Sequence, residues 1–275
     1  MRTTLYVVLL SFMLSIGLCG CSNAEEDASP GAIINSTDQF SVIAEQIGEV
    51  EAIGDCMIMQ GGCAAGDYAY FAMRDREKDL FSSTFILKYD LQTMEKIGQS
   101  EMLNLGHAND ITYVPDTNEL YIIHGGINIT VMDPDTLTVK DSKMLTRIEG
   151  WSIEYNPGQE RYVMGTANGG LVFYDKELEL LGAKSGVDTT LATQGICADE
   201  KYIYYLFYSE KKNTVEPDNM LFVYDWDGNF ITKITLGIEY EPENISLIGD
   251  TFYIGCNNSS WSGGLLFTAK IVKEE

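Results

Sequence analysis

The segment NITVMDPDTLTV (128–139) joins two β-branched runs through an aspartate-containing turn. The same arrangement returns in FILKYDLQTMEKI (85–97), LVFYDKELELLG (171–182) and LFVYDWDGNFITKI (221–234), and a degenerate copy, LLFTAKIVK, occupies 265–273. The aspartates of the four full copies, at positions 90, 133, 175 and 225, are spaced 43, 42 and 50 residues apart. Each copy predicts a β-hairpin, and recurrence at a nearly fixed period indicates a repeat architecture.

A second hairpin pattern precedes each copy. In it an apolar run meets a turn rich in Pro, Asp, Gly or Asn and continues as an alternating aromatic and β-branched run. The five versions are CAAGDYAYFAM (63–73), ITYVPDTNELYII (111–123), IEYNPGQERYVMG (153–165), ICADEKYIYYLF (196–207) and ISLIGDTFYIG (245–255). Two hairpins make four strands, so the unit is a four-stranded antiparallel sheet that occurs five times. No helical periodicity accompanies it.

Four antiparallel strands in a repeat of this length are typical of a β-propeller blade, which covers its two faces by packing against neighbouring blades. The sequence therefore predicts an all-β chain with a single five-bladed β-propeller over residues 38–275. The fifth copy lacks its outermost strand, whereas QFSVIAEQIG (39–48) has strand character and no partner of its own. We expect this N-terminal strand to close the ring by completing the last blade.

The repeats resemble the YVTN/NHL-type propeller repeats of exported bacterial proteins, with residues 128–139 as the nearest match. The resemblance extends over residues 38–275 as architecture. It implies a fold and no particular activity, because propellers carry enzymes, sugar-binding proteins and scaffolds alike.

The first residues have the layout of an export signal. Arg2 is followed by an apolar run that is too short to span a bilayer, and Leu18-Cys19-Gly20-Cys21 resembles the lipobox of bacterial lipoproteins. We predict that residues 1–20 are a signal peptide and that Cys21 carries the lipid. Residues 21–37 are expected to be a flexible tether, which places the propeller outside the cytoplasm and anchors it to the cell membrane.

Charge limits the partners of the exported part. Without residues 1–20 the chain has 17 basic and 41 acidic residues, a net charge near −24. Phosphate backbones and anionic headgroups repel such a surface, so nucleic-acid binding is not expected and membrane contact is expected only through the lipid.

Four cysteines remain beyond Cys21, and none has the spacing of a zinc site. Cys63 and Cys197 lie in apolar strand patterns and are interpreted as small buried residues. A Cys56–Cys63 or a Cys197–Cys256 bridge is compatible with an oxidising compartment, and the sequence does not choose between them.

Long connections fall on one face of the predicted ring, the face at which the inner strands begin. Polar and aromatic residues cluster at those starts and predict a ligand-binding ring at the channel mouth. The predicted residues are Gln60, His107, Asn109, Asp110, Glu149, Trp151, Gln194, Glu243 and Asn244. His124 is expected on the same face.

Amides, carboxylates and an aromatic ring suit a polar ligand such as a sugar or peptide, or a partner protein. The leading hypothesis is therefore a non-catalytic binding or scaffold module. The alternative is an extracytoplasmic, glycosidase-like hydrolase that uses Glu149 and Glu243 as acid and base. No catalytic motif accompanies that pair. No cofactor is predicted; Ca²⁺ or a metal held by His107 with these carboxylates is the minor alternative.

Overall fold

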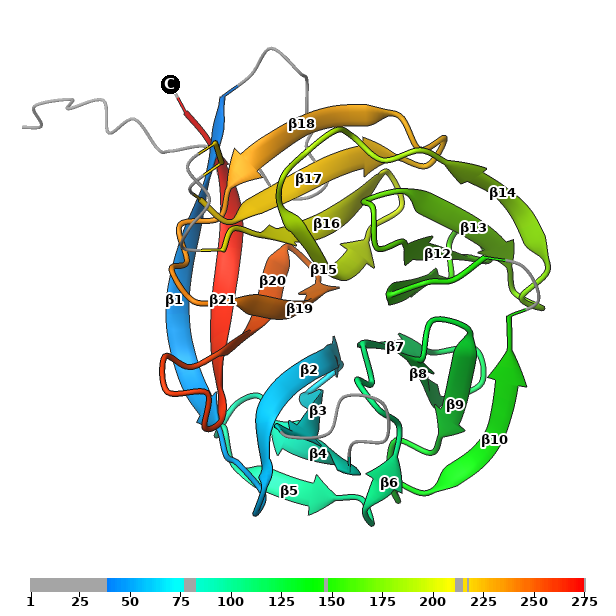
Figure 1. Cartoon of the computed structure of the whole chain (residues 1–275), viewed down its shortest axis with the longest axis vertical. Coiled ribbons are helices and arrows are strands. Elements are labelled where there is room, and N and C mark those ends of the chain that lie inside the picture. Colours follow the sequence, from blue (N-terminus) through cyan, green and yellow to red (C-terminus); the bar gives the residue numbers. More distant parts are fainter. Residues whose placement is uncertain (1–38, 77–82, 146–147, 211–214, 217, 275) are drawn as a thin grey trace, which may run out of the picture.

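The computed structural model describes residues 39–274 except 77–82, 146–147, 211–214 and 217. Every regular element in these residues is a β-strand, and the strands form five antiparallel sheets arranged as a ring (Figure 1). This confirms the predicted five-bladed β-propeller with four strands in each blade.

The blades follow the chain in order. Blade 1 contains β2 (Cys56–Ala65), β3 (Tyr68–Asp75), β4 (Ser83–Asp90) and β5 (Lys96–Gln99), and β6 (Leu103–Asn104) pairs with the start of β4. Blade 2 contains β7 (Asp110–Val114), β8 (Glu119–His124), β9 (Asn128–Met132) and β10 (Val139–Met144). Blade 3 contains β11 (Ser152–Asn156), β12 (Arg161–Gly165), β13 (Leu171–Asp175) and β14 (Leu180–Lys184). Blade 4 contains β15 (Ala192–Ala198), β16 (Tyr202–Tyr208), β17 (Met220–Asp225) and β18 (Phe230–Thr235). Blade 5 contains β19 (Pro242–Ile248), β20 (Thr251–Asn257) and β21 (Gly264–Lys273), and β1 (Phe40–Val50) is its fourth strand.

The ring is closed by the N-terminal strand. β1 pairs antiparallel with β21 from Phe40 opposite Lys273 to Val50 opposite Gly264, with one irregularity near Gln46 (Figure 1). The pairing confirms the predicted closing strand and extends it two residues beyond Gly48. The first and last strands of the propeller thus lie in one sheet.

The repeated aspartate builds the turn at the outer edge of each complete blade. Asp90 Oδ1 accepts hydrogen bonds from the backbone N–H groups of Gln92 and Thr93, both at 2.9 Å. Asp133, Asp175 and Asp225 accept equivalent bonds two to four residues ahead. A side chain that caps its own turn in this way favours the tight hairpin. The Asp225 segment is therefore a hairpin turn, as predicted.

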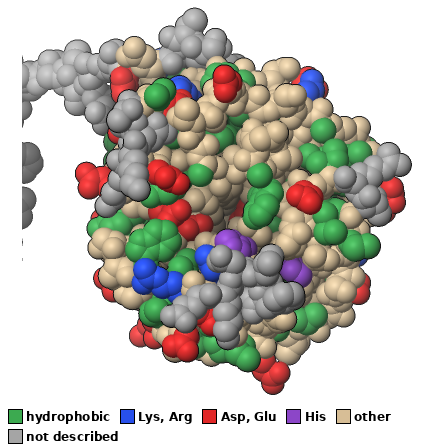
Figure 2. All heavy atoms as spheres, in the orientation of Figure 1, with side chains coloured by type: hydrophobic (Ala, Val, Ile, Leu, Met, Phe, Trp, Pro, Cys, Tyr) green, Lys and Arg blue, Asp and Glu red, His purple; other side chains and the backbone are tan. Residues whose placement is uncertain are grey.

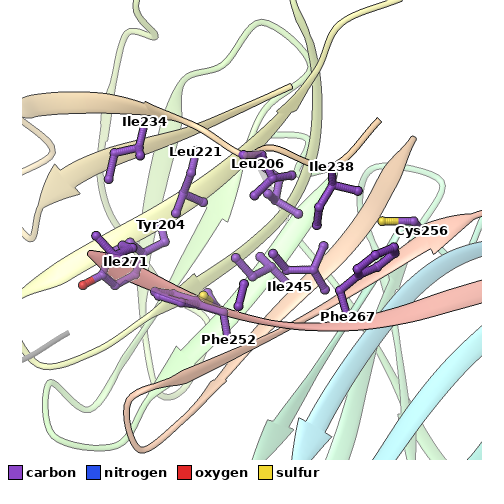
Figure 3. Packing of buried hydrophobic residues seen from close by; sticks show 14 of the residues in the cluster. Tyr204, Leu206, Leu221, Ile234, Ile238, Ile245, Phe252, Cys256, Phe267 and Ile271 are labelled. Carbon is purple, nitrogen blue, oxygen red and sulfur yellow. The ribbon is translucent and has the colours of Figure 1, made fainter. Parts of the chain in front are cut away.

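Apolar side chains fill the gaps between neighbouring blades. Five buried clusters are present, and each combines residues of two adjacent blades. Figure 3 shows the one between blades 4 and 5, where Leu206 and Leu221 lie opposite Ile245 and Phe267. Phe40 and Val42 of β1 pack against the same cluster. Burial of apolar area is the main favourable contribution to folding, so each sheet depends on both neighbours.

The inner strands surround the axis. β2, β7, β11, β15 and β19 contact one another in that order, and β19 contacts β2 to complete the circle. Polar side chains join them at the backbone: the N–H of Ala64 donates to Ser246 Oγ at 2.8 Å, and the N–H of Tyr155 donates to Thr112 Oγ1 at 3.0 Å. The innermost layer is therefore held by hydrogen bonds where the apolar clusters end.

Cys56, Cys63, Cys197 and Cys256 are all buried and free, so neither of the two bridges is present. Cys63 and Cys197 lie in the apolar clusters, as interpreted from the sequence. The predicted signal peptide, Cys21 and the tether lie outside the described residues. Within those residues no helix has the length and hydropathy to cross a membrane.

Removal of residues 39–50 should strongly destabilise the propeller, because β21 loses one of its two partner strands and two apolar clusters lose part of their cover. We expect the midpoint of thermal unfolding to fall by roughly 10 °C or more, measured by circular dichroism. A chain that begins at residue 38 is the control and should unfold like the parent. Equal stability of the two shortened chains would contradict the closing role of β1.

Candidate functional site

A pocket of about 410 Å³ lies where the inner strands begin. Every blade contributes to it through its inner strand or the residues just before that strand. The lining residues are Gln60, Arg74, His107, Asn109, Trp151, Ala167, Ala192, Thr193, Gln194, Glu241, Glu243 and Trp261. We call it the channel-mouth pocket. Figure 2 views this face of the ring, with histidine, acidic and hydrophobic side chains gathered around its centre.

Six of the nine residues predicted from the sequence line the pocket. They are Gln60, His107, Asn109, Trp151, Gln194 and Glu243. The other three, Asp110, Glu149 and Asn244, do not line it. These three residues make different contacts in the fold.

Asp110 is fully buried and acts as a junction between blades. Its carboxylate accepts hydrogen bonds from the N–H of Ile111 at 3.0 Å, of Ile153 at 3.1 Å and of Ile196 at 3.4 Å, which belong to blades 2, 3 and 4. Burial raises the pKa of this carboxyl well above its ordinary value, against the lowering effect of these three N–H donors. The side chain therefore organises the inner strands beneath the pocket.

Asn244 is also structural. Its side-chain amide donates to the carbonyl of Gln60 at 2.9 Å, which ties blade 5 to blade 1. A Cβ atom added to Gly255 would lie 2.5 Å from Asn244 Oδ1, so glycine is required there by the close approach. The amide fixes the backbone that carries Gln60 instead of facing a ligand.

Glu149 lies beside the turn between β8 and β9. A Cβ atom added to Gly126 of that turn would be 3.3 Å from Glu149 Cβ, and the next residue, Gly150, donates its N–H to the carbonyl of Gly126 at 2.7 Å. Of Glu149 and Glu243, the pair considered for acid–base catalysis, only Glu243 lines the channel-mouth pocket. His124 lies in the same region and shares a 3.0 Å hydrogen bond with Thr130 Oγ1.

Arg74, Glu241 and Trp261 are not among the nine site residues predicted from the sequence, although all three line the pocket. Arg74 is almost the last residue of β3, and Trp261 belongs to the connection between β20 and β21. Glu241 had a signal: Glu239, Glu241 and Glu243 alternate in LGIEYEPEN (236–244), and alternate residues of an extended segment share one side. Two of these three glutamates do face the pocket.

The two pocket glutamates are held by amides. Gln194 Nε2 donates to Glu241 Oε1 at 3.3 Å, and Asn257 Nδ2 donates to Glu243 Oε1 at 2.6 Å. Among the described residues Glu241 Oε2 is buried without a hydrogen-bond donor. Burial raises the pKa of Glu241 to about 7, and burial together with the Glu241 charge raises the pKa of Glu243, whereas Arg74 lowers both. Near neutral pH Glu241 can therefore both donate and accept hydrogen bonds.

Two tryptophans expose their rings in the pocket. Trp151 retains 37% of its surface and Trp261 36%. Such values are high for the largest apolar side chain, and a wet aromatic face is a surface on which a ligand can stack. The pocket thus combines aromatic faces, amides and carboxyl groups.

A further carboxyl lies deeper along the inner strands. Glu154 of β11 accepts a 2.8 Å hydrogen bond from Thr112 Oγ1, and burial raises its pKa to about 8. Even so, the described residues contain no group of three or more His, Cys, Asp or Glu side chains placed to hold a metal ion.

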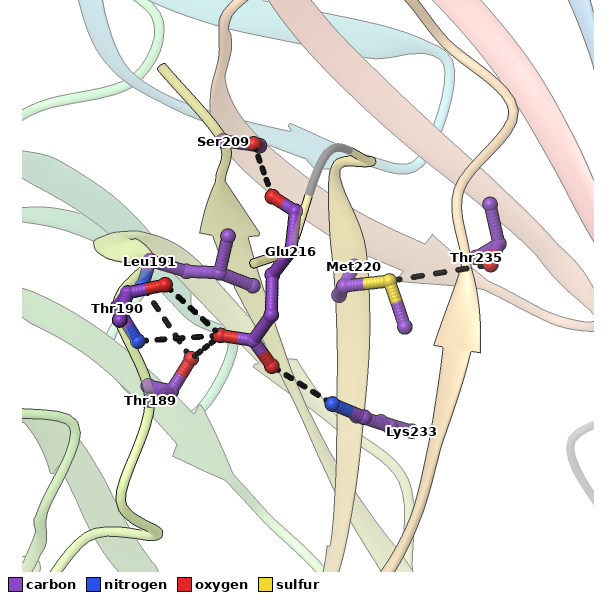
Figure 4. A network of polar contacts seen from close by, with 8 residues as sticks. All are labelled: Thr189, Thr190, Leu191, Ser209, Glu216, Met220, Lys233 and Thr235. Atoms are coloured by element: carbon purple, nitrogen blue, oxygen red, sulfur yellow. Dashed lines mark hydrogen bonds and ion pairs between the residues drawn. The ribbon is translucent and has the colours of Figure 1, made fainter. Parts of the chain in front are cut away.

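A polar network holds two connections of blade 4 next to each other. The Glu216 carboxylate accepts hydrogen bonds from Thr190 N–H at 3.1 Å and from Lys233 Nζ at 2.7 Å, and also from the Thr189 hydroxyl (Figure 4). The bonds from Lys233 and Thr189 lower the pKa of Glu216 to about 2. The network thereby fixes the segment before β15 to the connection that precedes β17. β15 begins with Ala192, Thr193 and Gln194, which line the pocket.

Comparison with the solved structure of a glutaminyl cyclase supports the fold. The crystal structure of Myxococcus xanthus glutaminyl cyclase matches with a TM-score of 0.60 at 12% sequence identity, over 86% of this chain and 100% of that one. The structure of U3-55K matches with a TM-score of 0.47 at 10% identity, over 82% and 63% of the two chains. No protein-family model and no curated protein matches the sequence. At these identities the likeness concerns the fold alone.

Substitution of Asp110 by alanine should reduce stability because it leaves buried N–H groups of three blades without their acceptor. At about 1–3 kcal/mol for each orphaned donor, we expect a loss of roughly 3 kcal/mol or more in the free energy of unfolding. Urea denaturation measures it. Asp110→Asn keeps one acceptor oxygen and should lose less, and Asp141→Ala, at an exposed position of β10, should lose little. If the Asp110→Ala variant is as stable as the parent, Asp110 does not stabilise the junction between the blades.

Proposed function

We propose that this chain is a non-catalytic binding module that holds a polar ligand, either a sugar or a peptide segment, in the channel-mouth pocket. The observation that carries the proposal is the convergence of all five blades on one cavity. Gln60, Asn109, Trp151, Gln194 and Glu243 come from blades 1 to 5 in turn. Amides and carboxyls that donate and accept, next to exposed aromatic rings, are the groups with which proteins orient polar ligands.

The hydrolase alternative has weaker support. Glu149 does not line the channel-mouth pocket with Glu243, and the two carboxyls that do line it, Glu241 and Glu243, are each hydrogen-bonded to an amide. The glutaminyl cyclase is an enzyme with a similar fold, but a shared propeller does not transfer an activity.

We propose further that the propeller is exported and tethered to the membrane through a lipid on Cys21. The apolar segment before Leu18-Cys19-Gly20-Cys21 and the strong negative charge of the remaining chain support this location. Because β1 lies at the outer edge of blade 5, the tether would leave the propeller from its rim and would not block the pocket.

The anchor is tested by a Cys21→Ser variant. The parent should be recovered in the membrane fraction and labelled by a radioactive fatty acid, whereas the variant should lose the label and leave the membrane. A variant with serine at Cys19 is the matched control and should behave like the parent. Labelling that persists in the Cys21→Ser variant would refute the assignment.

Binding is tested with a panel of glycans and peptides by calorimetry, beside a turnover assay of the same compounds. Trp151→Ala and Gln194→Ala should each raise the Kd of the tightest-binding ligand about tenfold, equal to ~1.4 kcal/mol in binding free energy. Leu181→Ala, an exposed change on β14, should leave affinity unchanged. If the parent turns over one of these compounds and a folded Glu243→Gln variant does not, the protein is a hydrolase and the binding-module proposal is wrong.

A further inference from the structure

A second pocket adjoins the channel-mouth pocket. It has a volume of about 240 Å³ and lies between blades 4 and 5. Its lining residues are Tyr208, Glu239, Tyr240, Glu241, Asn257, Asn258, Ser259 and Trp261. We call it the outer pocket. Glu241 and Trp261 line both pockets, so the two cavities meet at these side chains.

The wall between the pockets is a single hydrogen-bonded unit. Asn257 lines the outer pocket and is almost fully buried; its amide donates to Glu243 Oε1 of the channel-mouth pocket at 2.6 Å. The same side chain accepts a 2.9 Å hydrogen bond from the N–H of Met59 in blade 1. The wall is thereby fixed to the ring itself, which gives both pockets a defined relative position.

Trp261 stands at the junction in a backbone conformation that a bulky side chain rarely adopts. Its φ is 55°, in the left-handed region that favours glycine. The turn that imposes this conformation is built by Asn258, whose Oδ1 accepts from the N–H groups of Ser260 at 3.2 Å and Ser262 at 3.0 Å. Trp261 stays 36% exposed and lines both pockets, so its ring is accessible to a ligand in either one.

The composition of the two pockets points to a chemical class. Aromatic rings, amides, carboxyls and hydroxyls make up most of the lining, and the aliphatic contribution is limited to Ala167 and Ala192. Sugars match this set, because their hydroxyls pair with amides and carboxyls while their C–H faces stack on aromatic rings. The lining has three glutamates against one arginine, Arg74, and the chain has a net charge of −23, so anionic sugars are disfavoured.

From these observations we infer that the two pockets form one groove for an oligosaccharide, neutral or amine-bearing, that places one unit in each pocket and crosses Trp261. The inference rests on the proposed function and adds to it the class and the minimum length of the ligand. A single sugar would fill only one pocket, so affinity should increase with the second unit.

The test measures affinity against chain length by calorimetry with the purified protein. The probes are cello-, manno- and chito-oligosaccharides of one to four units, deacetylated chito-oligosaccharides, and a basic tetrapeptide. For at least one glycan series we expect the dimer to bind tenfold or more tightly than the monomer. Tetramers should bind no more weakly than dimers.

The variant Trp261→Gly isolates the junction. Glycine accepts a φ of 55° without strain, so the turn should persist and the melting temperature should not fall. The gain from monomer to dimer should then shrink to threefold or less. Trp151→Ala is the matched control, because Trp151 lines only the channel-mouth pocket; all lengths should weaken by the same factor.

Three results would overturn the groove. Monomers that bind as well as dimers would remove the second subsite and leave the proposed binding function in place. If the tetrapeptide binds more tightly than every glycan, the ligand is a peptide and not an oligosaccharide. Absence of binding by all probes in the panel, glycan and peptide, would count against the groove and the proposed function together.

Discussion

A four-stranded sheet has two faces to cover, and this requirement governs the whole molecule. Each of the five apolar clusters is shared by two blades, so no blade is complete without both neighbours. A linear array would leave the outer faces of its first and last sheets in water. The ring avoids this because the last cluster is formed by blades 5 and 1. Pairing of β1 with β21 then joins the ends of the propeller within one sheet.

Towards the axis the apolar clusters give way to hydrogen bonds. Asp110, Thr112 and Ser246 extend from one inner strand to the backbone of another, and Asn244 does so from blade 5 to blade 1. Buried backbone groups need partners, and each inner strand is the edge strand of its blade, so it has a sheet partner on one side only. Some polar residues on these strands therefore form hydrogen bonds between blades. Only those left over are available to a ligand.

The chemistry of the channel-mouth pocket comes from the polar and aromatic residues that do not hold the blades together. Its two glutamates, Glu241 and Glu243, lie in a cavity lined by protein, and burial raises the pKa of both. Trp151 and Trp261 reach the pocket from residues outside the regular strands, where side chains need not fill a gap between blades. A rigid ring of strands thus places aromatic and polar groups from loops and strand starts around one opening.

The amino-acid sequence by itself determined the repeat, the number of blades, the aspartate turns and the missing strand. These features are local: Asp90, Asp133, Asp175 and Asp225 each cap their own turn, and the fifth copy lacks that aspartate because its third strand continues along β1 instead of turning. Six of the residues that line the channel-mouth pocket were also predictable, since the inner strands and the residues just before them surround the axis. Side-chain direction outside the strands was decided only by the tertiary structure. Glu149 precedes β11, where strict alternation does not apply, and it turns to blade 2, whereas Trp151 faces the pocket. Arg74, Glu241 and Trp261 reach the pocket because blades distant in sequence meet there, a juxtaposition that no single segment encodes.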